Sequence, residues 1–358
     1  AAFYSLIKTY SILRQIEQKK IDTIFLYLNN KEILNSIIEW GRNKNIKFKN
    51  VSTKLNISKG CLFHYIRAIR NFMVYMNRVV AITRKMCTSY DFRIQKLKDI
   101  KYLIITYFPL VDRAAIKHRQ FVNMMFQPFQ NALRKQGIKY AWSAYIVHYE
   151  EYKLRDSIEL GKKINDWNET LFFWEEDLKF IDIIHVILIF HWISLKYLFA
   201  REKIKGFFTF EKNEIKFNTW HIFRNDCDDS FCGSVLVFNL IYYKIFKKFL
   251  RHINKEVIIL FPTEMQGWEK DLCAAAIETG RTKTIGIQHT TVPLFFLSYF
   301  CDKNELKSKY EKGGMPKPYK LACVGSIPER LMIESGWNNN DVFIFGGIRF
   351  NHFQKLID

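Results

Sequence analysis

The chain has 358 residues, of which 49% are apolar and 16% aromatic, and this composition excludes wholesale disorder. Seven prolines and fifteen glycines are few for this length, so long regular elements are expected rather than linkers. The net charge of +20 favours contact with phosphate groups on nucleic acid, nucleotides or anionic membranes, although lysine enrichment from an AT-rich genome would give the same composition.

Strands and helices are predicted to alternate along the chain. In sequence order they are a strand at 21–28, a helix at 30–45, strand 46–51, helix 57–86, strand 100–108, helix 120–137, strand 138–147, helices 150–166, 170–200 and 233–253, strand 256–261, helix 268–280, strands 283–288 and 319–325, helix 328–336 and strand 341–347. Such alternation is typical of an α/β fold in which helices cover both faces of a mostly parallel sheet. We therefore predict this fold class, with long amphipathic helices added to it.

The helical segment predicted at about 57–90 is basic and amphipathic. Segment 51–78 has the rhythm of a helix-turn-helix, with a polar turn before a basic helix. Its many Phe, Met and Tyr residues suit a solvent-facing recognition helix less well than an amphipathic helix on an anionic membrane, or a packed core helix. The basic stripe consists of Arg67, Arg70, Arg78 and Arg84.

The most apolar segment lies at about 180–200. It has the length of a membrane span, which is the alternative interpretation. Polar residues interrupt it, so we interpret it as a buried or membrane-surface helix. The interrupting residues are Asp182, His185, His191 and Lys196.

The cysteines are odd in number, scattered and without a C-x-x-C pair. This pattern predicts reduced, buried thiols rather than a disulfide or zinc framework. Cys227 and Cys232 lie five residues apart, but no nearby pair of ligands completes a zinc set. The seven are Cys61, Cys87, Cys227, Cys232, Cys273, Cys301 and Cys323.

Two predicted strands end in groups that can bond, titrate or stack. Ligands bind beyond the carboxyl ends of parallel strands, so these groups would face one crevice if the two strands are neighbours. In a sugar or phosphate site, Glu264 would accept hydroxyl protons, His289 would donate to an oxyanion and Trp268 would stack on a ring, while free N–H groups at the helix start would face an anion. A helix cap beside a satisfied histidine would give the same pattern. The residues are Glu264, Gln266, Trp268 and Glu269 after strand 256–261, and Gln288, His289, Thr290 and Thr291 after strand 283–288.

Asp112 follows the predicted strand 100–108, again at a carboxyl end. It would serve as a general base that takes a proton from an acceptor hydroxyl. A loop aspartate paired with Arg113 or Lys117 is the alternative.

A run of acidic residues precedes the predicted helix at 233–253. We expect Asp229 or Ser230 to cap that helix. Asp226 and Asp228 would need further ligands to hold a metal ion, and none can be identified, so no metal is predicted.

The stretch PTEMQGWEKDL…GIQHTTVPLFFLSYF resembles the bacterial surface-carbohydrate-biosynthesis glycosyltransferases. In that family an E-x-Q-x-W-E segment precedes a helix and a G-x-x-H-[ST]-T-V segment follows it. Here these segments begin at Glu264 and Gly286. Looser likenesses in YLIITYFPLVD…FVNMMFQPFQNALRKQGIKYAW and DCDDSFCGSVLVFNL extend the resemblance over about residues 100–350.

The resemblance implies a B-type glycosyltransferase with two Rossmann-like lobes that face each other across a cleft. It implies transfer of a sugar from a nucleotide-activated donor to a growing lipopolysaccharide or capsule chain, or to a lipid-linked glycan, in the cytoplasm at the inner face of the plasma membrane. Residues 1–340 would form the Rossmann-like acceptor-side lobe, and 341–358 would begin the connection to a donor lobe outside this sequence. The expected catalytic residues are Glu264, His289 and Asp112, and the expected substrate-binding residues are Gln266, Trp268, Glu269, Gln288, Thr290 and Thr291, with no metal or cofactor.

A non-catalytic function is the alternative. A basic α/β protein would bind nucleic acid or an anionic membrane surface through residues 1–98. Affinity that falls steeply with salt would mark such phosphate-directed binding, whereas a sugar nucleotide held in a cleft would respond far less.

Overall fold

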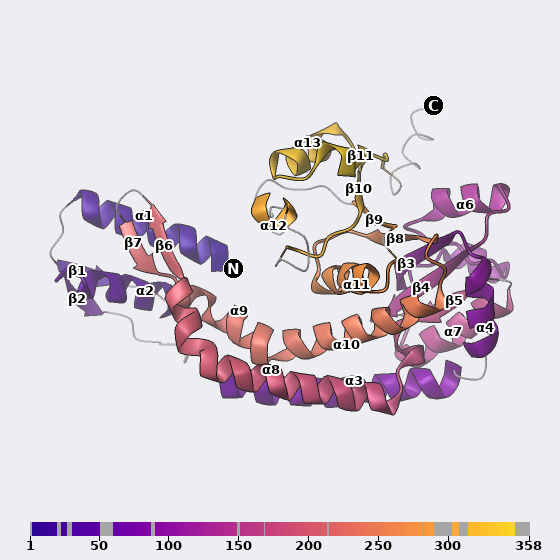
Figure 1. Ribbon diagram of the computed structural model, residues 1–358, viewed down its shortest axis with the longest axis horizontal. Coiled ribbons are helices and arrows are strands. Elements are labelled where there is room, and N and C mark those ends of the chain that lie inside the picture. The colour runs from indigo at the N-terminus through magenta and orange to yellow at the C-terminus, as the bar shows by residue number, and fades with distance from the viewer. Residues whose placement is uncertain are drawn as a thin grey trace. The chain divides into compact units, whose positions relative to one another are not determined.

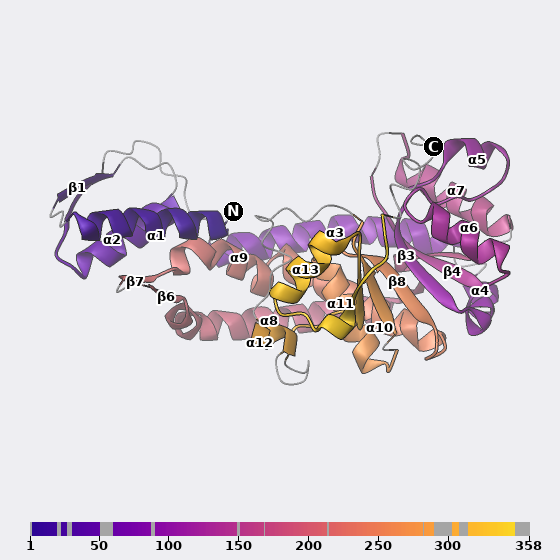
Figure 2. The same ribbon diagram turned by 90° about the horizontal axis from the view of Figure 1, so that it is seen from above.

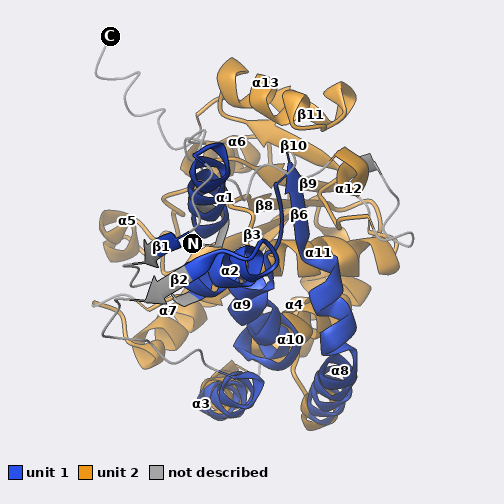
Figure 3. Cartoon of the chain, turned by 90° about the vertical axis from the view of Figure 1, so that its left-hand side faces the viewer, with its two compact units in different colours: residues 1–74, 184–238 blue, residues 75–183, 239–358 orange. Residues whose placement is uncertain are grey.

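The computed structural model describes residues 2–19, 23–26, 31–50, 60–86, 90–148, 151–167, 169–212, 215–281, 283–289, 303–307 and 314–347. The chain divides into two compact units: unit 1 comprises residues 1–74 and 184–238, and unit 2 comprises residues 75–183 and 239–358 (Figure 3). Each unit has its own cluster of buried apolar side chains. The chain is therefore divided differently from the single lobe predicted over 1–340.

Unit 2 is built around a seven-stranded parallel sheet flanked by helices, as the alternating pattern predicted (Figure 1). The strand order is β11-β10-β9-β8-β3-β4-β5, and every neighbouring pair is parallel. The strands are β3 (Tyr102–Phe108), β4 (Tyr140–Ile146), β5 (Leu171–Phe173), β8 (Ile258–Pro262), β9 (Thr284–Ile287), β10 (Lys320–Cys323) and β11 (Val342–Ile344).

The order of strands reverses at β3. From β3 the chain adds β4 and then β5 on one side, and later returns to place β8, β9, β10 and β11 on the other side. Tyr102 of β3 is thus opposite Tyr140 of β4 and also opposite Ile258 of β8. This is the Rossmann order, in which ligands bind outside the carboxyl ends of the strands at the point of reversal. In unit 2 that point lies between β3 and β8.

The helices of unit 2 pack on strands that are almost wholly apolar, as is usual for parallel strands covered on both faces. Gly161 of α7 lies so close to β5 that a Cβ atom there would come within 2.4 Å of the Phe173 ring. Helix α10 and helix α11 lie beside β8 in both views (Figures 1 and 2) and are joined by the ion pair of Lys247 with Glu278 at 2.7 Å. The helices are α4 (Tyr90–Lys96), α5 (Arg113–Lys117), α6 (Gln127–Lys135), α7 (Leu154–Asp166), α10 (Ser234–Phe249, begun in unit 1), α11 (Gly267–Glu278), α12 (Lys303–Lys307) and α13 (Ser326–Glu334).

Two predicted helices differ from the observed elements. The prediction of a helix over 170–200 was wrong at its start, because Leu171–Phe173 forms the edge strand β5 and helix α8 spans Phe180–Phe207. The helix predicted at 120–137 begins only at Gln127, with proline in its first turn. Before it, the Asn123 side chain accepts hydrogen bonds from two backbone N–H groups and holds a loop.

Unit 1 contains two small sheets and no part of the large one. The strands predicted at 21–28 and 46–51 pair with each other, and β6 and β7 form an antiparallel hairpin. Leu13, Leu34, Ile37 and Phe217 form its buried core. Its elements are α1 (Ala2–Gln18), β1 (Thr23–Leu26), α2 (Lys31–Arg42), β2 (Lys47–Asn50), the first half of α3 (Cys61–Met86), most of α8, β6 (Thr209–Lys212), β7 (Ile215–Asn218) and α9 (Trp220–Cys232).

The acidic run lies inside α9 and at its end. Asp229 accepts a hydrogen bond from the backbone N–H of Ser234 at 2.8 Å, which confirms the predicted cap on the next helix. Asp228 is fully buried and accepts hydrogen bonds from Tyr197 and Arg201, so its carboxylate serves an internal ion pair rather than a metal. Gly233 is required between the helices, because a Cβ atom there would lie 2.5 Å from the Asp229 Cα.

The prediction that disulfides are absent was wrong in one place. Cys61 at the start of α3 and Cys232 at the end of α9 form a disulfide, with their Cα atoms 6.7 Å apart. The two positions are 171 residues apart in the sequence, so only the packing of α3 against α9 brings them together. Cys87 and Cys301 lie outside the described residues.

A buried ion pair attaches α3 to the sheet in unit 2. Arg78 Nε donates to Glu175 Oε1 at 2.6 Å, and Arg78 Nη1 donates to the carbonyl of Ile146 at the end of β4. Glu175 is fully buried and also accepts a hydrogen bond from the Tyr75 hydroxyl. Burial opposes the charge on Arg78, but Glu175 outweighs it and raises the pKa of the guanidinium. Arg78 therefore belongs to the interior and not to an open basic stripe.

We expect Arg78→Ala to destabilise the protein by roughly 3 kcal/mol, because it leaves the Glu175 carboxylate buried without its counter-charge. Arg84→Ala is the matched control, since Arg84 is exposed on the same helix and its loss should cost less than about 0.5 kcal/mol. Urea unfolding followed by tryptophan fluorescence measures both. Equal losses for the two variants would contradict this account.

Candidate functional site

Three side chains meet at the carboxyl edge of the sheet, beside the point where the strand order reverses. Pro262 at the end of β8 is paired with Ile287 at the end of β9, so the residues that follow both strands lie at one edge. His289 Nε2 lies 3.0 Å from Glu264 Oε1. The Tyr107 hydroxyl, from β3, donates to Glu264 Oε2 at 3.5 Å. The structure thus brings Glu264 and His289 together and adds Tyr107 to them.

The three groups differ in their access to solvent. The Glu264 side chain is 32% exposed, whereas that of His289 is 4% exposed. Burial and the neighbouring Glu264 raise the pKa of Tyr107 far above neutrality, so its hydroxyl stays protonated and donates. Glu264 is therefore the group that a ligand can reach. His289 and Tyr107 contact its carboxylate from the protein side.

His289 is placed as a partner of Glu264 and not as a free donor. Its Nε2 is engaged with the carboxylate, and its Nδ1 is buried with no hydrogen-bond partner among the described residues. The oxyanion-donor function predicted for the imidazole would need an exposed N–H group. The geometry instead assigns His289 to orienting Glu264.

Glu269 shapes the turn that carries Glu264. Its two carboxylate oxygens accept hydrogen bonds from the backbone N–H groups of Glu264, Met265 and Gln266, at 2.8, 3.1 and 3.1 Å. Met265 adopts a left-handed backbone conformation with φ of 58°. Burial raises the pKa of Glu269 to about 7, although the three N–H donors act in the opposite direction.

The carboxylate of Glu269 thus occupies the N–H groups of the turn that leads into α11, which begins at Gly267. The phosphate-facing function expected for the first N–H groups of the helix itself stays a prediction. Glu269 was predicted to bind substrate, but its side chain is 4% exposed and turned inward. Glu269 instead belongs to the cap at the start of α11, which is the alternative stated for this pattern.

Trp268 and Gln288 are also buried. The Trp268 ring packs among those of Trp174, Tyr107 and Phe261, at centroid distances of 5.2 to 6.1 Å, so it offers no free face for stacking on a sugar. The Gln288 side chain accepts a hydrogen bond from the backbone N–H of Val324, beyond the end of β10.

Of the other residues predicted for the site, the structure describes Gln266 and Asp112. Gln266 is exposed at the carboxyl edge. Asp112 caps α5 by accepting from the N–H groups of Ala114 and Ala115, which is a different role from both general base and ion pair. Thr290 and Thr291 lie outside the described residues.

Tyr107 was missed by sequence reasoning. It is the second-last residue of β3 and follows Thr106, so two hydroxyl-bearing residues lie near the carboxyl end of this strand. The signal was available, because a polar group near the carboxyl end of a central strand points to the ligand-binding edge. What the sequence could not supply was the pairing of β3 with β8, which places the tyrosine next to Glu264.

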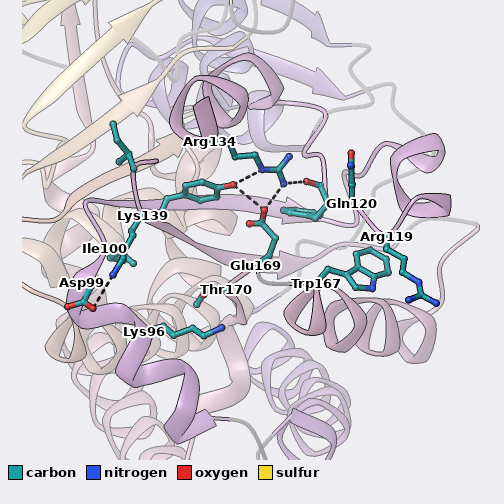
Figure 4. Close-up of a pocket in the computed structure, with 13 residues that line it drawn as sticks. Lys96, Asp99, Ile100, Arg119, Gln120, Arg134, Lys139, Trp167, Glu169 and Thr170 are labelled. Carbon is teal, nitrogen blue, oxygen red and sulfur yellow. Dashed lines mark hydrogen bonds and ion pairs between the residues drawn. The ribbon is translucent and has the colours of Figure 1, made fainter. Parts of the chain in front are cut away.

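A pocket of 720 Å³ opens at the opposite edge of the sheet, at the amino ends of β3, β4 and β5 (Figure 4). Its charged groups are largely engaged with each other. Arg134 pairs with Glu169 at 2.5 Å, Glu169 also accepts from the Tyr140 hydroxyl and the Trp142 indole, and Lys139 pairs with Asp99. We place the candidate site at the carboxyl edge, where Glu264 is half-exposed and its partners converge on it.

Comparison with known proteins identifies no relative of this chain. No family model matches the chain, and no curated protein or solved structure matches it. Within the described ranges, no group of three His, Cys, Asp or Glu side chains is arranged to hold a metal ion. The functional argument therefore depends on the topology and side chains of this chain itself.

Glu269→Gln should change how stability depends on pH. Because the pKa of Glu269 is raised from 4.5 to about 7 in the folded protein, its stabilising contribution is complete below pH 4.5 and is lost as pH rises through 7. Glutamine cannot ionise, so between about pH 5 and pH 8 the variant should gain up to roughly 3 kcal/mol relative to the wild type. Urea unfolding of both proteins at the two pH values measures this difference. A shift in favour of the wild type would mean that the N–H donors keep Glu269 ionised.

Proposed function

We propose that this chain is a glycosyltransferase, or the acceptor-side part of one, that moves a sugar from a nucleotide-activated donor to a bacterial surface polysaccharide or lipid-linked glycan. The observation that carries the proposal is the contact of Glu264 with His289 at 3.0 Å, beside the reversal point of a Rossmann-ordered sheet. The resemblance around Glu264 and His289 supports the same reaction class. A cytoplasmic location at the inner face of the plasma membrane would follow from such an acceptor.

In this reaction Glu264 acts as the general base. The acceptor hydroxyl oxygen bonds to the anomeric carbon, the bond from that carbon to the nucleotide phosphate breaks, and the nucleotide leaves with the electron pair. The hydroxyl proton passes to Glu264. His289 and Tyr107 each donate to one oxygen of this carboxylate, so the group is oriented before the acceptor arrives.

Glu264→Gln in the full-length protein should lower the transfer rate by about 10²- to 10⁴-fold, because glutamine keeps the shape of the side chain but cannot take the proton. Transfer of labelled sugar from a panel of nucleotide sugars to membrane glycan acceptors measures the rate. Glu256→Gln is the matched control, since Glu256 is an exposed carboxylate just before β8, at the opposite edge of the sheet. Wild-type transfer by Glu264→Gln would refute the assignment.

His289→Ala should reduce transfer, because the variant lacks the imidazole whose Nε2 lies 3.0 Å from the Glu264 carboxylate and orients it. The transfer assay used for the Glu264 variant measures the rate, and circular dichroism shows whether the variant folds. Wild-type transfer by His289→Ala would exclude a positioning function for His289.

A further inference from the structure

Unit 1 exposes two apolar stripes on long helices. In each stripe the apolar residues are spaced by four, three and four positions, so they lie along one side of their helix. Their exposed fractions range from 41% to 81%, and isolated soluble proteins rarely leave contiguous apolar surface of this kind open. The α3 stripe is Leu62, Ile66, Ile69 and Met73, and the α8 stripe is Leu188, Trp192, Leu195 and Phe199.

The two helices touch each other within unit 1. The Tyr65 hydroxyl of α3 lies 2.7 Å from His191 Nδ1 of α8, and the Tyr65 ring stacks on that of Phe190 at 5.4 Å. The apolar stripes therefore belong to neighbouring helices, which Figures 1 and 2 show running along each other. We call the eight side chains the apolar face.

Cations outnumber anions beside the apolar face. Helix α3 contains no Asp or Glu, and α8 contains none between residues 183 and 201. Arg70 and Lys196 are exposed on the same helices, and the exposed pair Glu202 and Lys203 follows the last residue of the α8 stripe. The Lys196 ammonium lies 3.6 Å from the centre of the Trp192 ring in a cation–π contact, and tryptophan side chains are enriched at the boundary between lipid chains and headgroups. This distribution matches a partner that is apolar inside and anionic at its surface.

A second copy of the chain fits the apolar face less well. Helices that pair through such stripes usually carry acidic and basic residues at the flanks, which attract across the interface. Two copies of this face would bring cation against cation, and like charges at an interface oppose association. An anionic bilayer has the complementary charge.

Helix α8 is held to the protein along its other side, which opposes a membrane-spanning arrangement. Among the described residues it is the one helix long and apolar enough to cross a membrane. Its residues Tyr197 and Arg201, however, hydrogen-bond to the fully buried Asp228 of α9. Crossing a bilayer would separate this ion pair and leave a buried carboxylate without its counter-charge.

We propose that the apolar face docks unit 1 on an anionic lipid bilayer, with α3 and α8 lying along the surface and their side chains inserted between the headgroups. Helices of this type bind through buried apolar area together with attraction to anionic lipids. The inference does not rest on the proposed glycosyl transfer, because every residue of the face lies in unit 1 and the candidate site lies in unit 2.

Flotation of the intact protein with vesicles tests the docking. Vesicles of phosphatidylcholine and phosphatidylglycerol in equal parts should bind the wild type at least about tenfold more strongly than pure phosphatidylcholine, and the difference should shrink as salt rises from about 0.05 to 0.5 M. The double variant Met73→Glu/Trp192→Glu should lose at least about tenfold in partitioning, because two charges enter the face. Ile327→Glu is the matched control, since Ile327 is 66% exposed on α13 in unit 2.

Three outcomes would overturn the docking inference. They are absence of binding by the wild type to anionic vesicles, equal loss in the face variant and the control, and resistance of bound protein to alkaline carbonate, which would indicate a span. Sedimentation equilibrium without lipid adds a fourth, because self-association abolished by the face variant would assign the face to a second copy. Circular dichroism confirms that the variants fold. Failure of docking leaves the transfer assay of the Glu264 variants unaffected, so the two proposals are tested separately.

Discussion

The pairing of β3 with β8 is the constraint on which the candidate site depends. After β5 the chain leaves the sheet, forms the second segment of unit 1, and returns to pair β8 with the free edge of β3. This return reverses the strand order and places the carboxyl ends of β3, β8 and β9 side by side. Parallel strands are rigid and hydrogen-bonded along their length, so the positions just beyond them are well defined. Glu264 and His289 occupy such positions, and Tyr107 is the second-last residue of β3.

Carboxylates in unit 2 serve two different purposes, and burial separates them. Glu175 and Glu269 are inside, where Arg78 pairs with Oε1 of Glu175 and three backbone N–H groups donate to Glu269. Such groups fix the position of a helix or a turn, because leaving them without partners would be costly. Glu264 has two side-chain partners and remains partly exposed, which is the condition for exchanging a proton with a ligand.

The polar groups of the candidate site and the exposed apolar surface lie in different units of the chain. The Rossmann-ordered sheet of unit 2 carries the groups suited to chemistry, and unit 1 carries the exposed apolar face with its cations. Helices α3, α8 and α10 each contribute residues to both units, so the chain crosses between them three times within regular helix. Such a layout places the proposed membrane-docking face and the proposed transfer site in alternating segments of one chain.

The sequence by itself determined the α/β class and most strands of the parallel sheet, and it placed Glu264 and His289 after the ends of two strands, because strand periodicity and the residues at strand ends are local properties. Their proximity required the pairing of β8 with β9, which the structure supplied. It did not reveal β5, since three apolar residues before a long helix are indistinguishable from the first turn of that helix. Nor did it separate Trp268 and Glu269, which are buried, from Glu264, which is not. Those outcomes were decided by tertiary structure, because β5 is defined by its pairing with β4 and the burial of a side chain depends on what packs over it. The Cys61–Cys232 pair and the burial of Arg78 depend on contacts between segments about 100 or more residues apart.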